Sequence, residues 1–126
     1  MDLPVVQAAD VLTTANFSWI DNIYTGSIPS DVVDNTTDNI VLFTETVNEP
    51  IFYANGIFKG WQIGVEMQIF YSLNPSFNLQ DAEISVAKSF AKSGWLIDQS
   101  KNRIKDPDTK QWTKVFYFIK NIRGGI

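Results

Sequence analysis

The sequence predicts an α+β domain in which two helices pack on one face of a largely antiparallel five-stranded sheet. Three observations predict this fold. Two segments carry apolar residues at helical spacing, one segment alternates strictly between apolar and polar residues, and turn-forming residues divide the rest into short runs rich in strand formers. The expected order is helix, three strands, helix, two strands. A chain of 126 residues is expected to form one domain, residues 1–126, with a flexible tail from about residue 123.

Each helix is predicted by an apolar stripe and by its end signals. The first is expected to begin at Asp2 as the cap, with Pro4 in its first turn. The second is expected over Leu79–Ser93, capped by Asn78 and followed by Gly94, which suits the left-handed position after a helix. The first stripe consists of Val5, Ala8, Ala9 and Leu12, and the second of Leu79, Ala82, Val86 and Phe90.

The clearest strand signal lies in Trp61–Leu73, where the odd positions from Trp61 to Tyr71 are apolar and most even positions are polar or glycine. Pro29 and the segment Asn48-Glu49-Pro50 are expected to end strands, and Ser30–Asn39 is expected to be a polar loop. The other expected strands are Trp19–Ile28, Ile40–Val47, one that starts at Trp95–Ile97 and becomes polar by Ser100, and Trp112–Ile122.

The last expected strand is apolar on both faces. One face carries Trp112, Phe116 and Phe118, and the other carries Val115, Tyr117 and Ile119. Two helices cover only one face of a sheet, so the second face requires another layer, another subunit or a ligand.

The segment Glu49–Trp61 is expected to be an apolar loop of about a dozen residues. Such a loop either folds back on the core or forms a docking surface, because aromatic residues are enriched in interface cores. The candidate interface residues from this loop and the sheet are Phe52, Tyr53, Ile57, Phe58, Trp61, Phe70, Val115, Tyr117 and Ile119.

Composition argues against most catalytic and cofactor chemistry. The chain has no histidine and no cysteine, which removes the usual base near neutral pH, imidazole ligands and thiolate chemistry. A net charge of −4 disfavours tight binding to nucleic acid or to anionic membranes. The N-terminus does not resemble a signal peptide, which indicates a cytoplasmic protein. The sequence therefore predicts a protein that is not an enzyme and that has no cofactor.

Two acidic segments contain candidate sites. Asp34, Thr36, Asp38 and Glu45 have the spacing of calcium ligands in an EF-hand loop, but Asn39 replaces the required glycine and a strand follows, which favours a solvated acidic loop. Asp106 and Asp108 flank Pro107 in a turn, where aspartates usually cap backbone N–H groups.

Several strings resemble a family of small tail proteins from siphophages of lactic-acid bacteria. The resemblance rests on residues 28–35, Ile-Pro-Ser-Asp-Val-Val-Asp-Asn, on residues 65–71, Val-Glu-Met-Gln-Ile-Phe-Tyr, and on Gly94–Ile97. It continues through Asp106–Thr109 and residues 113–118, Thr-Lys-Val-Phe-Tyr-Phe, and spans nearly the whole chain. It contains no catalytic motif.

The resemblance implies a tail terminator, also called a tail completion protein. Such a protein forms a hexameric ring that caps the tail tube, which is built from the major tail tube protein, at its head-proximal end. The ring then presents the surface to which the head–tail connector protein binds. Assembly would take place in the cytoplasm of the bacterial host, and DNA would only pass through the ring lumen. The implied fold, a mixed sheet with helices on one side, agrees with the order expected from the residues.

Two alternatives remain open. The first is a head–tail connector or other neck protein of the same particle. The second, from another class, is a module for a small ligand, with the uncovered sheet face and the aromatic loop forming its pocket.

Overall fold

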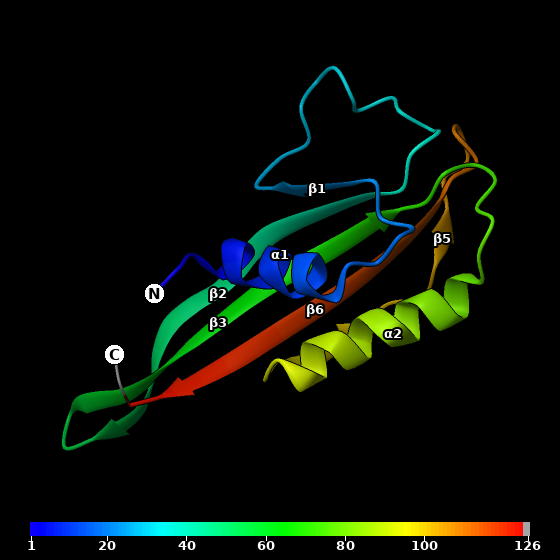
Figure 1. Ribbon diagram of the computed structural model, residues 1–126. Coiled ribbons are helices and arrows are strands. Elements are labelled where there is room, and N and C mark those ends of the chain that lie inside the picture. Colours follow the sequence, from blue (N-terminus) through cyan, green and yellow to red (C-terminus); the bar gives the residue numbers. More distant parts are fainter. Residues whose placement is uncertain (125–126) are drawn as a thin grey trace.

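The computed structural model describes residues 1–124 and has the expected α+β architecture, with six strands rather than five. Figure 1 shows both helices on the same side of the sheet. The elements in chain order are α1 (Pro4–Ala15), β1 (Asn22–Thr25), β2 (Ile40–Ala54), β3 (Ile57–Phe70), α2 (Leu79–Lys92), β4 (Leu96–Ser100), β5 (Ile104–Lys105) and β6 (Trp112–Arg123).

The sheet has the order β1-β2-β3-β6-β4, and β5 also pairs with β6. All pairs are antiparallel except β1 with β2, whose parallel register places Asn22 beside Ile40. The unexpected strand is β5, where Ile104 pairs with Thr113 and Lys105 with Trp112. Two residues are too few for a visible alternation, so no sequence pattern marks them.

The core lies between the sheet and the two helices. The expected alternation is confirmed, because Ile63, Val65, Met67 and Ile69 of β3, and Tyr71 directly after it, are buried on the helix side. The stripes of both helices are also confirmed: Ala8 and Leu12 of α1 and Ala82, Val86 and Phe90 of α2 are buried. Phe116 and Phe118 complete this layer from β6, whereas Trp112 lies near the strand end and is 39% exposed.

The ends of α2 follow the expected chemistry, whereas the start of α1 does not. Asn78 Oδ1 accepts a hydrogen bond from Asp81 N at 3.0 Å, and Gly94 has φ of 90°, as the position after a helix requires. At α1 the cap is Leu3, with no side-chain hydrogen bond. Pro4 occupies the first helical position, so the cap falls on Leu3 and the prediction of Asp2 was wrong.

The first strand is shorter than the expected Trp19–Ile28. Trp19 instead packs among aromatic side chains: its ring stacks on that of Phe77, with 5.0 Å between centroids, and is tilted against that of Tyr71, with 5.9 Å between centroids. The need to bury this indole removes the segment before Asn22 from the strand.

The strands β2 and β3 form one continuous hairpin, so the expected loop over Glu49–Trp61 was wrong. Pro50 does not end β2 but pairs with Trp61 of β3. Because β1 accompanies β2 only as far as Phe43, Pro50 lies where β2 has a neighbour on one side only, and a missing N–H is tolerated there.

None of the helices within residues 1–124 has the length and apolar character needed to span a bilayer.

Arg123, where the flexible tail was expected to begin, is the last residue of β6, and Gly124 N donates to Lys59 O at 2.8 Å. The rest of the expected tail, residues 125–126, lies outside the described residues.

Candidate functional site

The outer end of the β2–β3 hairpin projects beyond the rest of the sheet. We call residues 51–59 the hairpin arm. The last pair between β3 and β6 joins Gly60 to Arg123, so the arm has no further strand beside it (Figure 1). Its turn is Asn55-Gly56, whose φ values are 53° and 75°. Positive φ at both residues is typical of a two-residue hairpin turn whose backbone twist matches that of the flanking strands.

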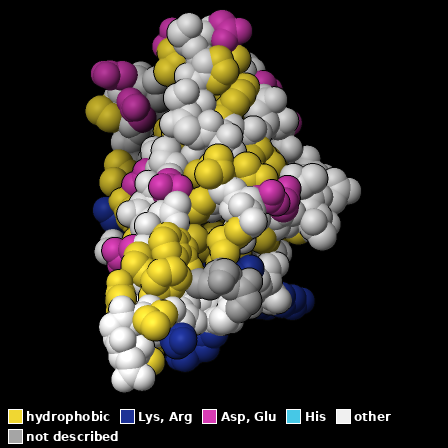
Figure 2. Space-filling model, turned by 90° about the vertical axis from the view of Figure 1, so that its left-hand side faces the viewer, with side chains coloured by type: hydrophobic (Ala, Val, Ile, Leu, Met, Phe, Trp, Pro, Cys, Tyr) yellow, Lys and Arg dark blue, Asp and Glu magenta, His cyan; other side chains and the backbone are white. Residues whose placement is uncertain are grey.

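The arm exposes three large apolar side chains. Tyr53 is 63% exposed, Ile57 58% and Phe58 42%. Figure 2 views the molecule from the side on which the arm lies, and hydrophobic side chains gather in the lower half of that view with Lys and Arg side chains below them. These three residues, predicted as candidates in a loop, lie instead on a strand pair: Tyr53 and Phe58 are paired across the two strands on one face, and Ile57, paired with Ala54, points to the other.

Phe52 and Trp61 have a different role at the base of the arm. The Phe52 ring lies 3.7 Å from the Arg123 guanidinium carbon and covers Gly60, where an added Cβ would come within 2.3 Å of the ring. Phe52 has φ of 60°, a conformation that costs a residue other than glycine on the order of 1–3 kcal/mol. Trp61 is half-buried and donates from Nε1 to Asn48 Oδ1 at 2.6 Å. These two side chains fix the direction of the arm.

The face of the sheet away from the helices carries Val115, Tyr117 and Ile119, all half-buried. Their separation from the core face confirms the expected two-sided character of β6. Tyr117 donates its hydroxyl proton to Glu66 Oε2, and Gln68 donates to Glu66 Oε1 at 2.7 Å. The hydrogen bond to Glu66 raises the pKa of Tyr117. This uncovered face is therefore mixed, with an ordered polar centre between apolar side chains.

Gly64 permits close packing on the uncovered face. An added Cβ would lie 2.9 Å from Thr46 Oγ1 and 3.3 Å from Ile119 Cγ2. Thr46 is the extra residue of a bulge between Glu45 and Val47. Phe70, the remaining candidate, pairs with Ile40 and Thr113 near the opposite end of β3, so the structure does not bring it together with the arm.

The candidate acidic residues hydrogen-bond to the backbone and to neighbouring side chains. Asp106 Oδ1 accepts from the N–H groups of Asp108 and Thr109, as expected for a turn, and these bonds lower the pKa of Asp106. In the acidic loop, Asn35 Nδ2 donates to Asp38 Oδ2 at 2.9 Å. Within residues 1–124 no three acidic side chains converge as metal ligands would.

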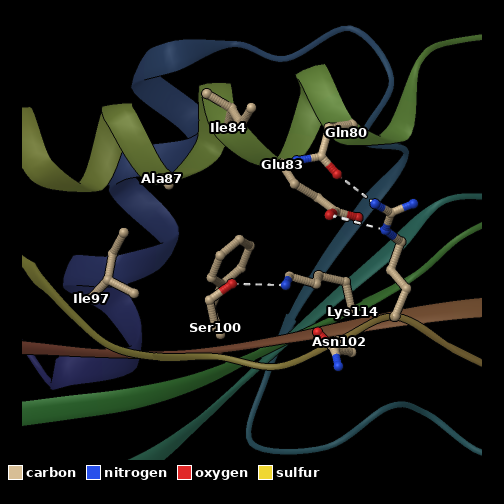
Figure 3. A pocket seen from close by; sticks show the side chains of 10 residues that line it. Gln80, Glu83, Ile84, Ala87, Ile97, Ser100, Asn102 and Lys114 are labelled. Atoms are coloured by element: carbon tan, nitrogen blue, oxygen red, sulfur yellow. Dashed lines mark hydrogen bonds and ion pairs between the residues drawn. The ribbon is translucent and has the colours of Figure 1, made fainter.

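A buried polar cluster, absent from the sequence predictions, lies between α2 and the sheet. Glu83 is only 5% exposed; its Oε2 accepts from the Tyr71 hydroxyl at 2.7 Å, and its Oε1 lies 3.2 Å from Arg103 Nε. Figure 3 shows Gln80 and Glu83 reaching from α2 toward the pocket, and Arg103 Nη2 donates to Gln80 Oε1 at 2.6 Å. Burial, followed by the hydrogen bond to the Glu83 carboxylate, raises the pKa of Tyr71 far above its usual range.

This raised pKa predicts a stability difference that depends on pH. Below pH 10 Tyr71→Phe should cost about 1.5–3 kcal/mol, the value of a hydrogen bond to a charged group. Above pH 10 the unfolded state releases the Tyr71 proton while the folded state retains it, so wild-type stability falls with rising pH. The gap between wild type and variant should therefore shrink by about 1.4 kcal/mol per pH unit. Urea unfolding of both proteins from pH 8 to 11 measures it, and a constant gap would contradict the prediction.

Comparison with known proteins identifies the family of this chain, and the function of that family is unknown. A family model described as a protein of unknown function, DUF806, matches residues 3–123. No curated protein matches the chain. The match covers α1 through the last residue of β6, the whole of the sheet and both helices. The chain therefore belongs to the DUF806 family.

Proposed function

We propose that this protein is a structural subunit of a siphophage tail, the tail terminator, which acts by assembling into a ring on the end of the tail tube. The observation that supports assembly is the hairpin arm, which holds Tyr53, Ile57 and Phe58 away from the core in a fixed direction. The tail assignment rests on the sequence resemblance, which implies a hexameric ring and a head-joining surface.

A ring requires two different patches on each subunit, because contacts in a cyclic oligomer above a dimer are heterologous. The hairpin arm supplies one apolar patch. The uncovered face, with Val115 and Ile119, supplies a second on another part of the molecule. In the proposed ring these patches contact neighbouring subunits or the tail tube protein, and DNA passes through the lumen without specific binding.

The proposal predicts that the arm is needed for assembly and dispensable for folding. A triple variant, Tyr53→Ser, Ile57→Ser and Phe58→Ser, removes the exposed apolar side chains of the arm. Surface changes of this kind usually alter stability by about 0.5 kcal/mol or less per site, so the variant should stay folded. Size-exclusion chromatography with light scattering should show that this variant does not form rings. It should also fail to cosediment with purified tail tubes.

The matched control changes three equally exposed apolar residues away from the arm, Val33→Ser, Leu73→Ser and Ile104→Ser, whose exposures are 63%, 43% and 65%. This variant should assemble as the wild type does. Wild-type protein that never joins tail tubes, or an arm variant that joins them normally, would contradict the proposal.

Particles made without the protein distinguish the terminator from the neck-protein alternative. Loss of a terminator gives overlong tails in negative-stain electron microscopy, since nothing stops tube growth. Tails of normal length that fail to attach to heads would instead identify a connector.

A further inference from the structure

A pocket of about 310 Å³ lies between α2, β4 and β6 and is separate from the hairpin arm and the uncovered face. Its volume falls at the lower end of the range for small-molecule sites. Ala87, Ile97 and Phe116 supply apolar wall, and Lys114 and Arg103 supply positive charge. Figure 3 shows Lys114 extending toward Ser100, with Asn102 beside them.

Lys114 is a buried cation whose hydrogen-bond partners are neutral. It is 8% exposed, and its Nζ donates to Ser100 Oγ at 2.8 Å and to the Lys101 carbonyl oxygen. An ammonium has three N–H donors, so these bonds leave one. Burial lowers the pKa of Lys114, which means that the surroundings stabilise its charge less well than water does.

The carboxylate in the pocket wall is already engaged. Both oxygens of Glu83 have partners, Oε1 with Arg103 and Oε2 with the Tyr71 hydroxyl. Two cations and one carboxylate leave one net positive charge facing the pocket. One monoanion would balance this charge, whereas a dianion would also meet repulsion from Glu83.

We propose that this pocket binds a small monocarboxylate with a short apolar body. The carboxylate accepts from Lys114 Nζ, and the apolar body packs against Ala87, Ile97 and Phe116. Charge-assisted hydrogen bonds supply the selectivity for an anion over a neutral analogue of the same shape. This inference does not depend on the proposed role in a phage tail.

Titration with hexanoate, and with hexanamide as the neutral analogue, tests the proposal by amide chemical shifts in NMR. Hexanoate should give saturable shifts at residues 84–87 and 97–103, with an affinity at least about tenfold above that of hexanamide. Lys114→Met keeps a long side chain and removes the charge, and it should weaken hexanoate binding about tenfold or more. The control is Lys88→Met, the same change at an exposed position of α2, which should leave binding unchanged.

A second variant guards against misfolding of the first. Ile97 is 46% exposed at the pocket, so Ile97→Asp adds a negative charge there without altering Lys114, and it should also weaken hexanoate binding. The proposal is overturned by any of three results: no saturable shifts at the pocket, equal affinity for hexanoate and hexanamide, or unchanged binding in folded Lys114→Met or Ile97→Asp.

Discussion

Phe90→Ala is expected to lower the free energy of unfolding by about 3–5 kcal/mol, the range for removing a buried phenylalanine ring. Phe90 is fully buried, and its ring stacks on that of Phe118 with 4.0 Å between centroids and 2° between planes. The rings of Trp95 and Phe43 lie 5.8 Å and 6.1 Å away. The variant therefore opens a cavity where α2, β2 and β6 meet.

Urea unfolding measures the loss, and Phe58→Ala is the matched control. Phe58 is 42% exposed on the hairpin arm, so its replacement should cost well under half as much. Equal losses in the two variants would mean that α2 does not contribute its aromatic ring to the core as described.

Glu83→Ala is expected to destabilise the protein by about 3 kcal/mol, the lower end of the range for breaking a buried ion pair. The lower end applies because the Arg103 side chain remains 32% exposed and recovers some solvation. The change leaves the buried Tyr71 hydroxyl without its acceptor and leaves the Arg103 and Lys114 charges without a carboxylate.

The amide variant Glu83→Gln separates charge from shape. It retains an acceptor for Tyr71 and should lose less than the alanine variant. Glu49→Ala, at an exposed position of β2, should change stability by no more than about 0.5 kcal/mol. Combining Glu83→Ala with Lys114→Met should recover part of the loss, since the second change removes an unbalanced cation. Additive losses in the double variant would contradict the electrostatic link between Glu83 and Lys114.

The sequence predicted those elements in which residue type follows from burial of one face of a single helix or strand. The stripes of α1 and α2 and the alternation in β3 reflect burial on one face, and burial determines residue type at every turn or every second position. The same logic correctly separated Phe116 and Phe118 from Val115, Tyr117 and Ile119.

Two sequence signals within the β2–β3 hairpin conflict. Pro50 argued for a strand end, although proline is tolerated where a strand has a neighbour on one side only. Asn55-Gly56, between two runs of strand formers, was the stronger signal, since both residues accept the positive φ that a tight hairpin requires. This dipeptide therefore predicts the hairpin arm, whereas Pro50 alone predicts a loop.

The buried polar cluster could not be predicted from one segment. Glu83 and Lys114 sit at core-facing positions of α2 and β6, and an isolated charge at such a position is unfavourable. Their burial becomes possible only when Tyr71, Arg103 and Ser100 arrive from other elements to satisfy them. The signal available in the sequence was a charged residue at an otherwise apolar position of each pattern, Glu83 on the stripe of α2 and Lys114 on the face of β6 that carries Phe116 and Phe118.

The place of β6 in the sheet has a consequence for synthesis. This strand lies between β3 and β4, yet it follows every other element in the chain. During translation the β2–β3 hairpin can close early, because its strands adjoin a tight turn, whereas the apolar surface that Phe116 and Phe118 cover stays open until β6 leaves the ribosome. A nascent chain stalled before Trp112 therefore offers chaperones and proteases an incomplete sheet, and the emergence of β6 from the ribosome is the step at which the domain can first become cooperative.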